Sequence, residues 1–378
     1  MVDIAIVASN SILRHPRIWK IANSLKKKYH MSAFGWNREG VSSQDINRYV
    51  VPLSLFGLKA PFNRPVLILY YPFFWTWILF NLLVNRPSVV HAIDLDTLLP
   101  CIIYKLILRK KLVYDVHDRF GGYVPPQYNT LFKIINLVEE LLSKQADVLV
   151  TVSDKVQGTF RLKPKHSVII MNLSEDYTLN ETPLKDNMLT VVYTGLILKD
   201  QGLEMIASAI KDLSGVRLVL AGRIADKQLL DQLLKLPNVK YEGLLERKQS
   251  LKLEASSDAM IVLYDLQYRK NQLSSPNKIF EAMMCGIPLI TNMEQELVGS
   301  EIGCGIIVDY NDIAQIKKAI VLLRDNVELR KKMGQNGRKA FEEKYNWNKM
   351  EQKLNEIYSN LILSESSFNA HKHVGSEN

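Results

Sequence analysis

The stretch Ser274-Ser-Pro-Asn-Lys-Ile-Phe-Glu-Ala-Met-Met-Cys-Gly-Ile-Pro-Leu-Ile-Thr291 joins a turn, a helix and a buried strand. Pro276 suits the first turn of a helix, because the amide hydrogen that proline lacks has no partner there. The unpaired amides of that turn, with Lys278 beside them, predict an anion site, and Glu281 about one turn later can accept hydrogen bonds from sugar hydroxyls. Gly286 ends the helix, and the apolar residues after it are typical of a buried parallel strand. The stretch therefore predicts a corner that binds phosphate and sugar.

Working outward, apolar strand-like runs alternate with helical stretches in both halves of the chain. Strands are expected at residues 4–9, 30–36, 88–93, 111–117, 147–153 and 167–171, and then at 189–194, 216–221, 238–242, 258–262, 287–291 and 305–309. Helices are expected at residues 17–28, 98–108 and 130–144, and then at 203–213, 227–236, 248–255, 278–285 and 313–324. The alternation predicts an α/β protein of two doubly wound Rossmann-like domains, with ligands bound in an interdomain cleft at the carboxyl ends of the strands.

The composition places the domain boundaries. Residues 1–172 form the expected N-terminal domain, polar residues 173–188 a linker, and residues 189–345 the C-terminal domain. Residues 346–363 are expected to be a helix able to cross back to the N-terminal domain, and residues 364–378 a disordered tail.

Charge and cysteine content narrow the class of protein. The formal net charge of +9 favours an anionic partner: nucleic acid, an acidic membrane surface or a phosphorylated substrate. No zinc-finger spacing or RNA-binding signature occurs, so we expect no nucleic acid. The three cysteines lie in apolar contexts without metal spacing, which argues against a disulfide framework or structural zinc and fits a cytoplasmic protein.

The uncharged run from Val66 to Val84 is long enough to be considered as a membrane span. Pro72 and Asn81 interrupt it, and its tyrosine and tryptophan rings prefer interfaces. A helix at a membrane face, a buried helix and a true span all remain open. The basic runs at residues 26–28 and 109–111 would suit anionic lipid headgroups, although solvated helix ends also explain them.

Several segments together resemble the family-4 glycosyltransferases, which are retaining, nucleotide-sugar-dependent enzymes of the GT-B fold. They follow in the family's order over most of the chain: His91-Ala-Ile-Asp-Leu-Asp-Thr-Leu-Leu99, Val113-Tyr-Asp-Val-His-Asp118, Val192-Tyr-Thr-Gly-Leu-Ile-Leu-Lys-Asp-Gln-Gly-Leu203, Leu220-Ala-Gly-Arg223, Val239-Lys-Tyr-Glu-Gly243 and the opening stretch. The resemblance implies that the N-terminal domain binds the acceptor and the C-terminal domain binds the nucleotide-sugar.

The donor site is expected at the strand ends of the C-terminal domain. Gly195 would allow close approach of a diphosphate, and the Lys199 and Lys278 cations would stabilise charge on the departing nucleotide. By the resemblance, Glu281 holds the nucleotide ribose, and Arg223 could contact base or phosphate. The alternative is a plain turn for Gly195, a solvated loop for Lys199, a surface glutamate for Glu281 and a structural ion pair for Arg223. Asn277 completes the expected set.

Departures from the family pattern weaken this assignment. Leu273 stands where the family has the first of two paired glutamates, and Leu196 and Gln201 stand where it has cations after the glycine. Ile93 stands where it has a second histidine, near the transferred sugar. The set of cations that would bind the diphosphate is therefore incomplete. More of the nucleotide binding is expected to depend on Asn277 and its neighbours in the opening stretch.

Asp94 and His117 are left as the catalytic candidates, because they could orient the acceptor, although a histidine after a strand is often structural. Arg14 and Arg17, at the start of a helix, could meet an anionic acceptor or simply be solvated. Asp118 is a further acceptor candidate.

We expect a glycosyltransferase acting on a glycan or lipid-linked acceptor of surface polysaccharide or glycan synthesis, at the cytoplasmic face of the membrane. Neither a metal nor another cofactor is expected, since no Asp-x-Asp pair occurs in the donor half. A non-catalytic GT-B protein that binds nucleotide or glycan as a partner subunit is the alternative. A nucleotide-sugar epimerase or a glycoside hydrolase is less favoured, the latter because no carboxylate pair can be placed.

Overall fold

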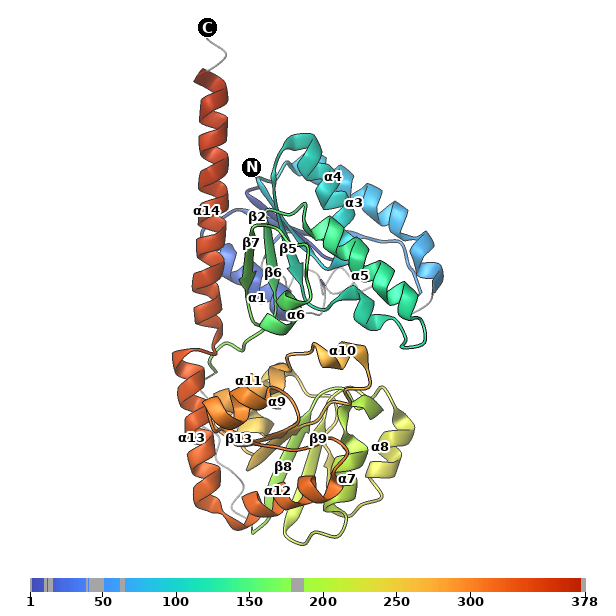
Figure 1. Ribbon diagram of the computed structural model, residues 1–378, viewed down its shortest axis with the longest axis vertical. Coiled ribbons are helices and arrows are strands. Elements are labelled where there is room, and N and C mark those ends of the chain that lie inside the picture. The colour runs from blue at the N-terminus through green and yellow to red at the C-terminus, as the bar shows by residue number, and fades with distance from the viewer. Residues whose placement is uncertain are drawn as a thin grey trace. The chain divides into compact units, whose positions relative to one another are not determined.

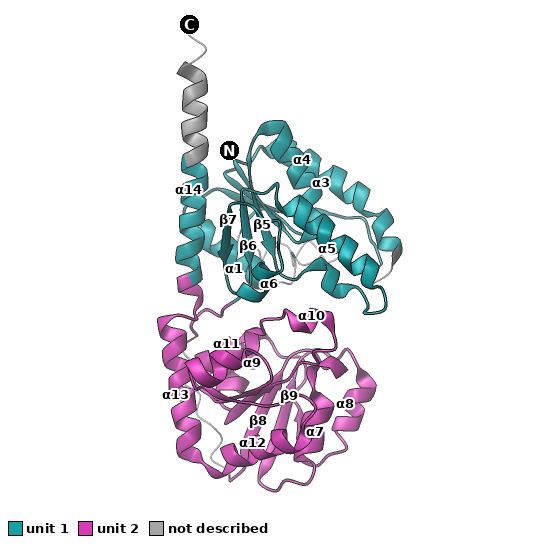
Figure 2. Ribbon diagram, in the orientation of Figure 1, with its two compact units in different colours: residues 1–172, 350–378 teal, residues 173–349 magenta. Residues whose placement is uncertain are grey.

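A computed structural model describes residues 2–9, 12, 16–38, 40, 51–61, 65–177 and 187–374, with side chains described up to residue 363. The chain divides into two compact units (Figure 2). Unit 1 comprises residues 1–172 and 350–378, and unit 2 comprises residues 173–349. Each unit contains its own parallel sheet, so the α/β class and the doubly wound, Rossmann-like architecture expected from the sequence are confirmed.

The sheet of unit 1 has seven parallel strands in the order β3-β2-β1-β4-β5-β6-β7. They are β1 (Ile4–Val7), β2 (Met31–Trp36), β3 (Leu53–Phe56), β4 (Val89–Ile93), β5 (Lys111–Val116), β6 (Val148–Thr151) and β7 (His166–Ile169). The helices are α1 (Pro16–Leu25), α3 (Tyr71–Asn85), α4 (Leu95–Leu108), α5 (Asn129–Ser143), the short α6 (Asp154–Gly158) and α14 (Trp347–Val374), with 3-10 turns η2 (Pro65–Leu69) and η3 (Phe120–Tyr123). Helices α3, α4 and α5 lie on one face of the sheet, while α1 and α14 lie on the other (Figure 1). Strand β3 was not expected, because it is a short, half-exposed edge strand with little alternation.

Helix α14 joins unit 1 although it follows unit 2 in sequence. Its Tyr358 is fully buried, and the hydroxyl lies 2.5 Å from Nδ1 of His91 on β4. Near the end of α1, Lys27 pairs with Glu351 and Tyr29 contacts Ser359. The helix continues to Val374, well into the segment expected to be a disordered tail. Residues 375–378 lie outside the described part.

The apolar run from Val66 to Val84 folds as η2 and most of α3. Phe74, Ile78 and Leu82 are fully buried, one turn apart, whereas Phe73 and Phe80 remain exposed. Among the described residues, no helix combines the length and the apolar character needed to cross a bilayer. Of the three alternatives, the true span is therefore not supported, and one stripe of the run packs on the sheet.

The sheet of unit 2 has six parallel strands in the order β10-β9-β8-β11-β12-β13. They are β8 (Leu189–Thr194), β9 (Val216–Ala221), β10 (Val239–Tyr241), β11 (Ala259–Val262), β12 (Leu289–Thr291) and β13 (Gly305–Ile307). The helices are α7 (Leu203–Ile210), α8 (Lys227–Leu233), α9 (Arg247–Ala255), α10 (Arg269–Gln272), α11 (Asn277–Cys285), α12 (Ile313–Asp325) and α13 (Val327–Glu343), with η4 (Lys199–Gln201) after β8 and the π-helical turn η5 (Glu296–Glu301) after β12.

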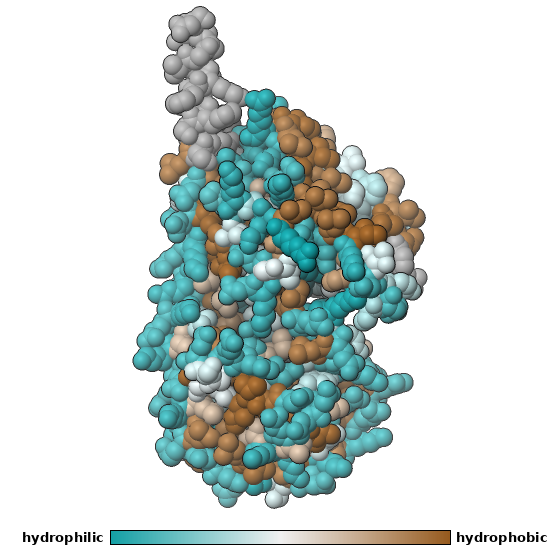
Figure 3. Space-filling view, in the orientation of Figure 1, coloured by the Kyte–Doolittle hydropathy of each residue, from teal (hydrophilic) through white to brown (hydrophobic). Residues whose placement is uncertain are grey.

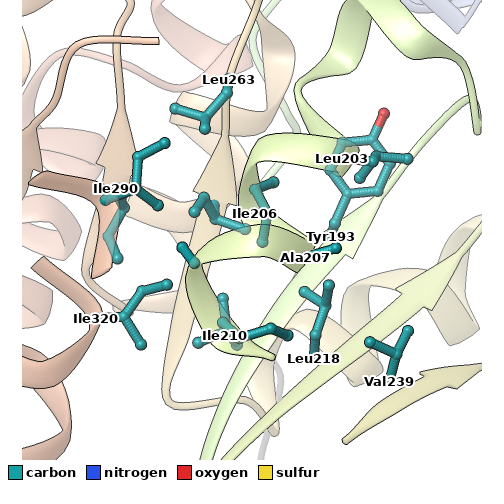
Figure 4. Packing of buried hydrophobic residues seen from close by; sticks show 14 of the residues in the cluster. Tyr193, Leu203, Ile206, Ala207, Ile210, Leu218, Val239, Leu263, Ile290 and Ile320 are labelled. Atoms are coloured by element: carbon teal, nitrogen blue, oxygen red, sulfur yellow. The ribbon is translucent and has the colours of Figure 1, made fainter. Parts of the chain in front are cut away.

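The core of unit 2 lies between this sheet and helices α7, α8 and α12. Leu203, Ile206 and Ile210 of α7 are fully buried against Leu218 of β9 and Ile290 of β12 (Figure 4). On the other face, α11 lies between α9 and α13. This packing holds the first turns of α9 and α11 at the edge where the strands end.

Candidate functional site

Helices α9 and α11 of unit 2 bring four charged side chains together. Glu281 of α11 is 3% exposed, and its carboxylate lies 2.6 Å from Nζ of Lys278 and 2.5 Å from Arg247, the first residue of α9. The same Lys278 ammonium lies 3.1 Å from the buried Glu254 carboxylate. Thr194, the last residue of β8, donates to Glu254 at 2.5 Å. The expected pair Lys278 and Glu281 is thus part of a larger cluster tied to a strand end.

The ion pairs fix the protonation state of the cluster. Burial alone would raise the pKa of Glu281, but Lys278 and Arg247 outweigh it and lower that pKa to about 2. Burial and the nearby Glu281 charge instead raise the pKa of Glu254. Glu281 is therefore an ionised acceptor at any physiological pH, which suits a group that binds sugar hydroxyls.

Arg247 is the residue that sequence reasoning missed. Its side chain is 42% exposed, and its guanidinium donates to Ser174 Oγ at 2.9 Å as well as pairing with Glu281. In sequence it resembles any cation at a helix start, and only the packing of α9 on α11 brings it to Glu281. It supplies a positive charge at a site where Leu196 and Gln201 replace expected cations.

The charge of Lys278 is already matched. Its side chain is 21% exposed, and its ammonium lies between two buried carboxylates, Glu254 and Glu281. An ammonium has three donors, and two of those of Lys278 are directed at these carboxylates. In this structure its visible role is to orient and ionise the glutamate, and the prediction that it also meets a diphosphate stays a prediction.

The other donor candidates lie at the strand ends of the same unit. Gly195 follows β8, and its carbonyl packs so closely on Gly222 that a Cβ on Gly222 would lie 1.8 Å from it. Gly222 also has φ +134°, so glycine is required there for both reasons. Lys199, the first residue of η4, and Arg223 are exposed beyond these glycines, and the Ile197 amide joins the two segments by donating to the Arg223 carbonyl at 2.9 Å.

Asn277 is exposed at the first position of α11, where a phosphate or sugar can reach the unpaired amides of the helix start. It lies one turn before Glu281, on the helix that carries the cluster. No described contact joins Asn277, Lys199 or Arg223 to the Glu281 cluster, so the structure assembles only part of the predicted donor set.

An open pocket of about 480 Å³ lies farther along the same edge, after β11, β12 and β13. Its lining includes Asp265, Asn292, Asp309 and Tyr310. None of the predicted donor residues lines it. The pocket therefore does not coincide with the Glu281 cluster, and we do not assign it to the donor.

In unit 1, Asp94 follows β4 in a strained backbone conformation. Its φ of 60° and ψ of 166° fall in a region that only glycine visits readily. The carboxylate accepts a hydrogen bond from the His117 amide at 3.0 Å, and the Asp94 amide donates to the Asp115 carbonyl. Burial raises the pKa of Asp94 to about 7. Strain and a shifted pKa both mark functional positions, so they support Asp94 as a candidate.

The two catalytic candidates are brought together, and a buried network lies beneath them. His117 is 8% exposed, with Nε2 3.6 Å from Asp115. Burial lowers the pKa of His117, but the Asp94 and Asp115 carboxylates outweigh it and leave that pKa raised. Asp115 itself is fully buried between Arg17, at 2.8 Å, and His91, at 3.1 Å. Burial disfavours its charge, yet Arg17 and His117 hold its pKa well below the usual range.

The acceptor candidates that the structure describes differ in burial. Arg17 is fully buried, and its guanidinium pairs with Asp115 and donates to the Ile170 carbonyl. The expected contact between Arg17 and an anionic acceptor is therefore wrong, and this side chain has a structural role inside unit 1. Asp118 is exposed and accepts a hydrogen bond from Tyr123 at 2.7 Å, which leaves it accessible. Arg14 lies outside the described residues.

Comparison with known proteins gives a consistent picture. Residues 176–340 match the family described as Glycosyl transferases group 1. An uncharacterized glycosyltransferase of Methanocaldococcus jannaschii is 25% identical over 293 residues, covering 71% of this chain and 73% of that protein.

Solved structures resemble the chain over nearly its whole length. The sucrose-phosphate synthase of Thermosynechococcus elongatus matches with a TM-score of 0.76 at 14% identity, covering 96% of this chain and 100% of that one. HepE of Anabaena, in complex with UDP and glucose, matches with a TM-score of 0.73 at 15% identity, covering 95% of this chain and 100% of that one. At such identities these structures establish the fold, which is GT-B.

Proposed function

We propose that the chain, a glycosyltransferase of the GT-B type, transfers a sugar from a nucleotide-sugar with retention of anomeric configuration; its residues 176–340 match the model of the group 1 glycosyl transferases. The observation that carries the donor assignment is the Glu281 cluster. A buried carboxylate, kept ionised by Lys278 and Arg247 and placed beside two helix starts, offers acceptors for ribose hydroxyls and donors for phosphate within unit 2.

The proposed reaction is a substitution on one face of the sugar. A bond forms between the acceptor oxygen and the anomeric carbon while the bond from that carbon to the phosphate oxygen breaks. The acceptor proton passes to the leaving phosphate, so no protein base is required. Lys199, Arg223 and Arg247 would stabilise the phosphate charge, and no metal ion or other cofactor is needed in this scheme.

We place the acceptor with unit 1. Asp94 and His117 would orient its hydroxyl, with Asp118 as an accessible polar neighbour. A glycan or lipid-linked acceptor of polysaccharide synthesis, at the cytoplasmic membrane face, is supported by the net charge of +9 and by the exposed apolar residues of α3.

A thermal-shift panel of UDP, GDP, ADP and their sugars tests the donor site. A ligand at about a hundred times its Kd should add about 2.7 kcal/mol to the stability of the folded protein. The ligand that stabilises the wild type should fail to stabilise Glu281→Ala at the same concentration. Equal stabilisation of both proteins would place the ribose elsewhere, and binding without sugar transfer would point to a non-catalytic nucleotide-binding subunit.

A further inference from the structure

Helix α5 packs on unit 1 with its apolar face outward. Its fully buried side chains are Glu139 and Ser143, and Glu139 accepts a hydrogen bond from Tyr114 at 2.9 Å. On the opposite face, Leu131, Ile134, Leu137 and Leu141, spaced three or four residues apart, are each about half exposed. A helix of a water-soluble surface normally has the reverse arrangement. The outward stripe therefore calls for a non-aqueous partner.

The exposed apolar surface continues onto the neighbouring helices. Helix α4 packs between α3 and α5 and exposes Leu106 and Ile107. Helix α3 contains no charged residue. With η2 it exposes these apolar side chains: Val66, Ile68, Leu69, Phe73, Phe80 and Val84. Figure 3 shows hydrophobic residues gathered over this part of unit 1. Three adjacent helices thus expose apolar side chains together, whereas scattered single apolar residues are normal on soluble proteins.

A basic pocket adjoins this face at the end of α4. It measures about 320 Å³ and is lined by four cationic side chains against one carboxylate: Lys105, Arg109, Lys110 and Lys111 against Asp147. Lys105 pairs with Asp147 at 2.7 Å. Leu106 lines the pocket and is also 65% exposed on the apolar face. Cationic and apolar groups therefore meet at one place, as a phospholipid headgroup and its acyl chains require.

The basic residues gather at one edge of the sheet. Helices α3, α4 and α5 each run back to the edge where the strands begin, so Arg86, Arg109 and Lys144 all follow their carboxyl ends, and all three are exposed. Asp94 and His117 follow strands at the opposite edge. The pocket is therefore separate from the candidate acceptor site.

We propose that the face formed by η2, α3, α4 and α5 binds an anionic lipid bilayer, with the Lys105, Arg109, Lys110 and Lys111 pocket taking a headgroup phosphate. The apolar stripes enter the interface between headgroups and acyl chains, and the cations contact the charged surface. Neutral membranes lack the second interaction, and salt screens it. Bilayer binding by this face does not depend on sugar transfer, so the two can fail separately.

Vesicle flotation of the full chain tests the surface. We expect the wild type to float with phosphatidylcholine–phosphatidylglycerol vesicles at low salt, more weakly at high salt, and far less with phosphatidylcholine alone. Ile134→Glu/Leu141→Glu should lower the partition coefficient at least about tenfold, because two charges enter the apolar stripe. The matched control Leu234→Glu/Leu322→Glu places the same charges on exposed leucines of unit 2 and should bind like the wild type.

A second pair of variants tests the pocket. Arg109→Gln/Lys110→Gln should remove most of the preference for phosphatidylglycerol while retaining weak binding to both vesicles. The control Lys317→Gln/Lys318→Gln removes the same charge from the exposed side of α12 and should keep that preference. Thermal unfolding and nucleoside-diphosphate binding, measured on every variant, establish that each is folded.

Failure of the folded wild type to float with anionic vesicles would overturn the proposal, as would equal losses in the Ile134/Leu141 variant and its control. If sedimentation shows instead that a second copy of the chain covers the face and excludes vesicles, the lipid assignment is wrong. If the wild type floats with anionic vesicles but binds no nucleoside diphosphate, the donor site is refuted and the membrane surface is not.

Discussion

Replacement of Arg247 by glutamine should weaken nucleotide binding, because it removes one of the two cations that hold Glu281. Loss of a hydrogen bond to a charged group costs about 1.5–3 kcal/mol. Arg247 is 42% exposed, so solvent screening reduces this to about 1–2 kcal/mol, or a 5- to 30-fold higher Kd. The pKa of Glu281 should rise from about 2, since Arg247 is one of the groups that lower it.

Titration calorimetry with the nucleoside diphosphate that binds the wild type most tightly measures this effect. Arg338→Gln is the matched control. Arg338 pairs with Asp176 at 2.8 Å, two residues after the Ser174 that Arg247 contacts, but it is not paired with Glu281. The control should lose some stability and keep the wild-type Kd. A Kd for Arg247→Gln within about twofold of the control would refute the assignment of this cation to the donor site.

Three further changes probe the two units. Asp94 has a pKa of about 7 in the folded protein, against 3.8 ordinarily, so between these pH values the folded protein holds a proton that the unfolded chain has lost. Asp94 therefore contributes stability at low pH that is lost as the pH rises toward 7. Asp94→Asn should abolish this part of the pH dependence in urea unfolding and remove an activity inflection near pH 7. Gly222→Ala should destabilise unit 2 by about 3 kcal/mol in thermal unfolding, because the added Cβ meets a carbonyl oxygen at 1.8 Å. Asp115→Asn should destabilise unit 1 by about 3–5 kcal/mol in urea unfolding, since it leaves the charge of buried Arg17 unmatched.

Control variants and contrary outcomes test the physical reasons given for these changes. Gly158→Ala, at a helical position with no atom within 4 Å of the new Cβ, should not destabilise the protein, and equal effects at both glycines would contradict the packing described for Gly222. Asp325→Asn, on the surface, should leave stability unchanged. An unaltered pH profile in Asp94→Asn would show that another group titrates near pH 7.

The succession of strands and helices could be predicted because it depends on local patterns. Buried parallel strands are apolar runs, and turns and helix ends carry glycine, as Gly286 does with φ +67° at the end of α11. Strand β3 escaped prediction because an edge strand is only half buried. Helix α4 begins three residues earlier than expected, since Pro100 is tolerated inside it and obscures its start.

The candidate site was harder to predict because its charges are paired over long sequence distances. Arg17 resembles a solvated helix start until Asp115, 98 positions away, is brought against it. Arg247 and Glu254 belong to a helix that gave no signal for ligand binding, yet both contact the Lys278 and Glu281 pair of α11. The opening stretch supplies Lys278 and Glu281, which lie together as the sequence predicts, whereas the partners that set their charge depend on tertiary packing.

Sugar release from radiolabelled nucleotide-sugars, compared between the wild type and Glu281→Gln, tests the central claim most directly. Glutamine keeps the size of the side chain but removes the charge that Lys278 and Arg247 hold. The account predicts that the wild type consumes at least one UDP-, GDP- or ADP-sugar and that Glu281→Gln consumes it at least about tenfold more slowly at subsaturating donor. Equal consumption by both proteins, or none by the wild type, would contradict it.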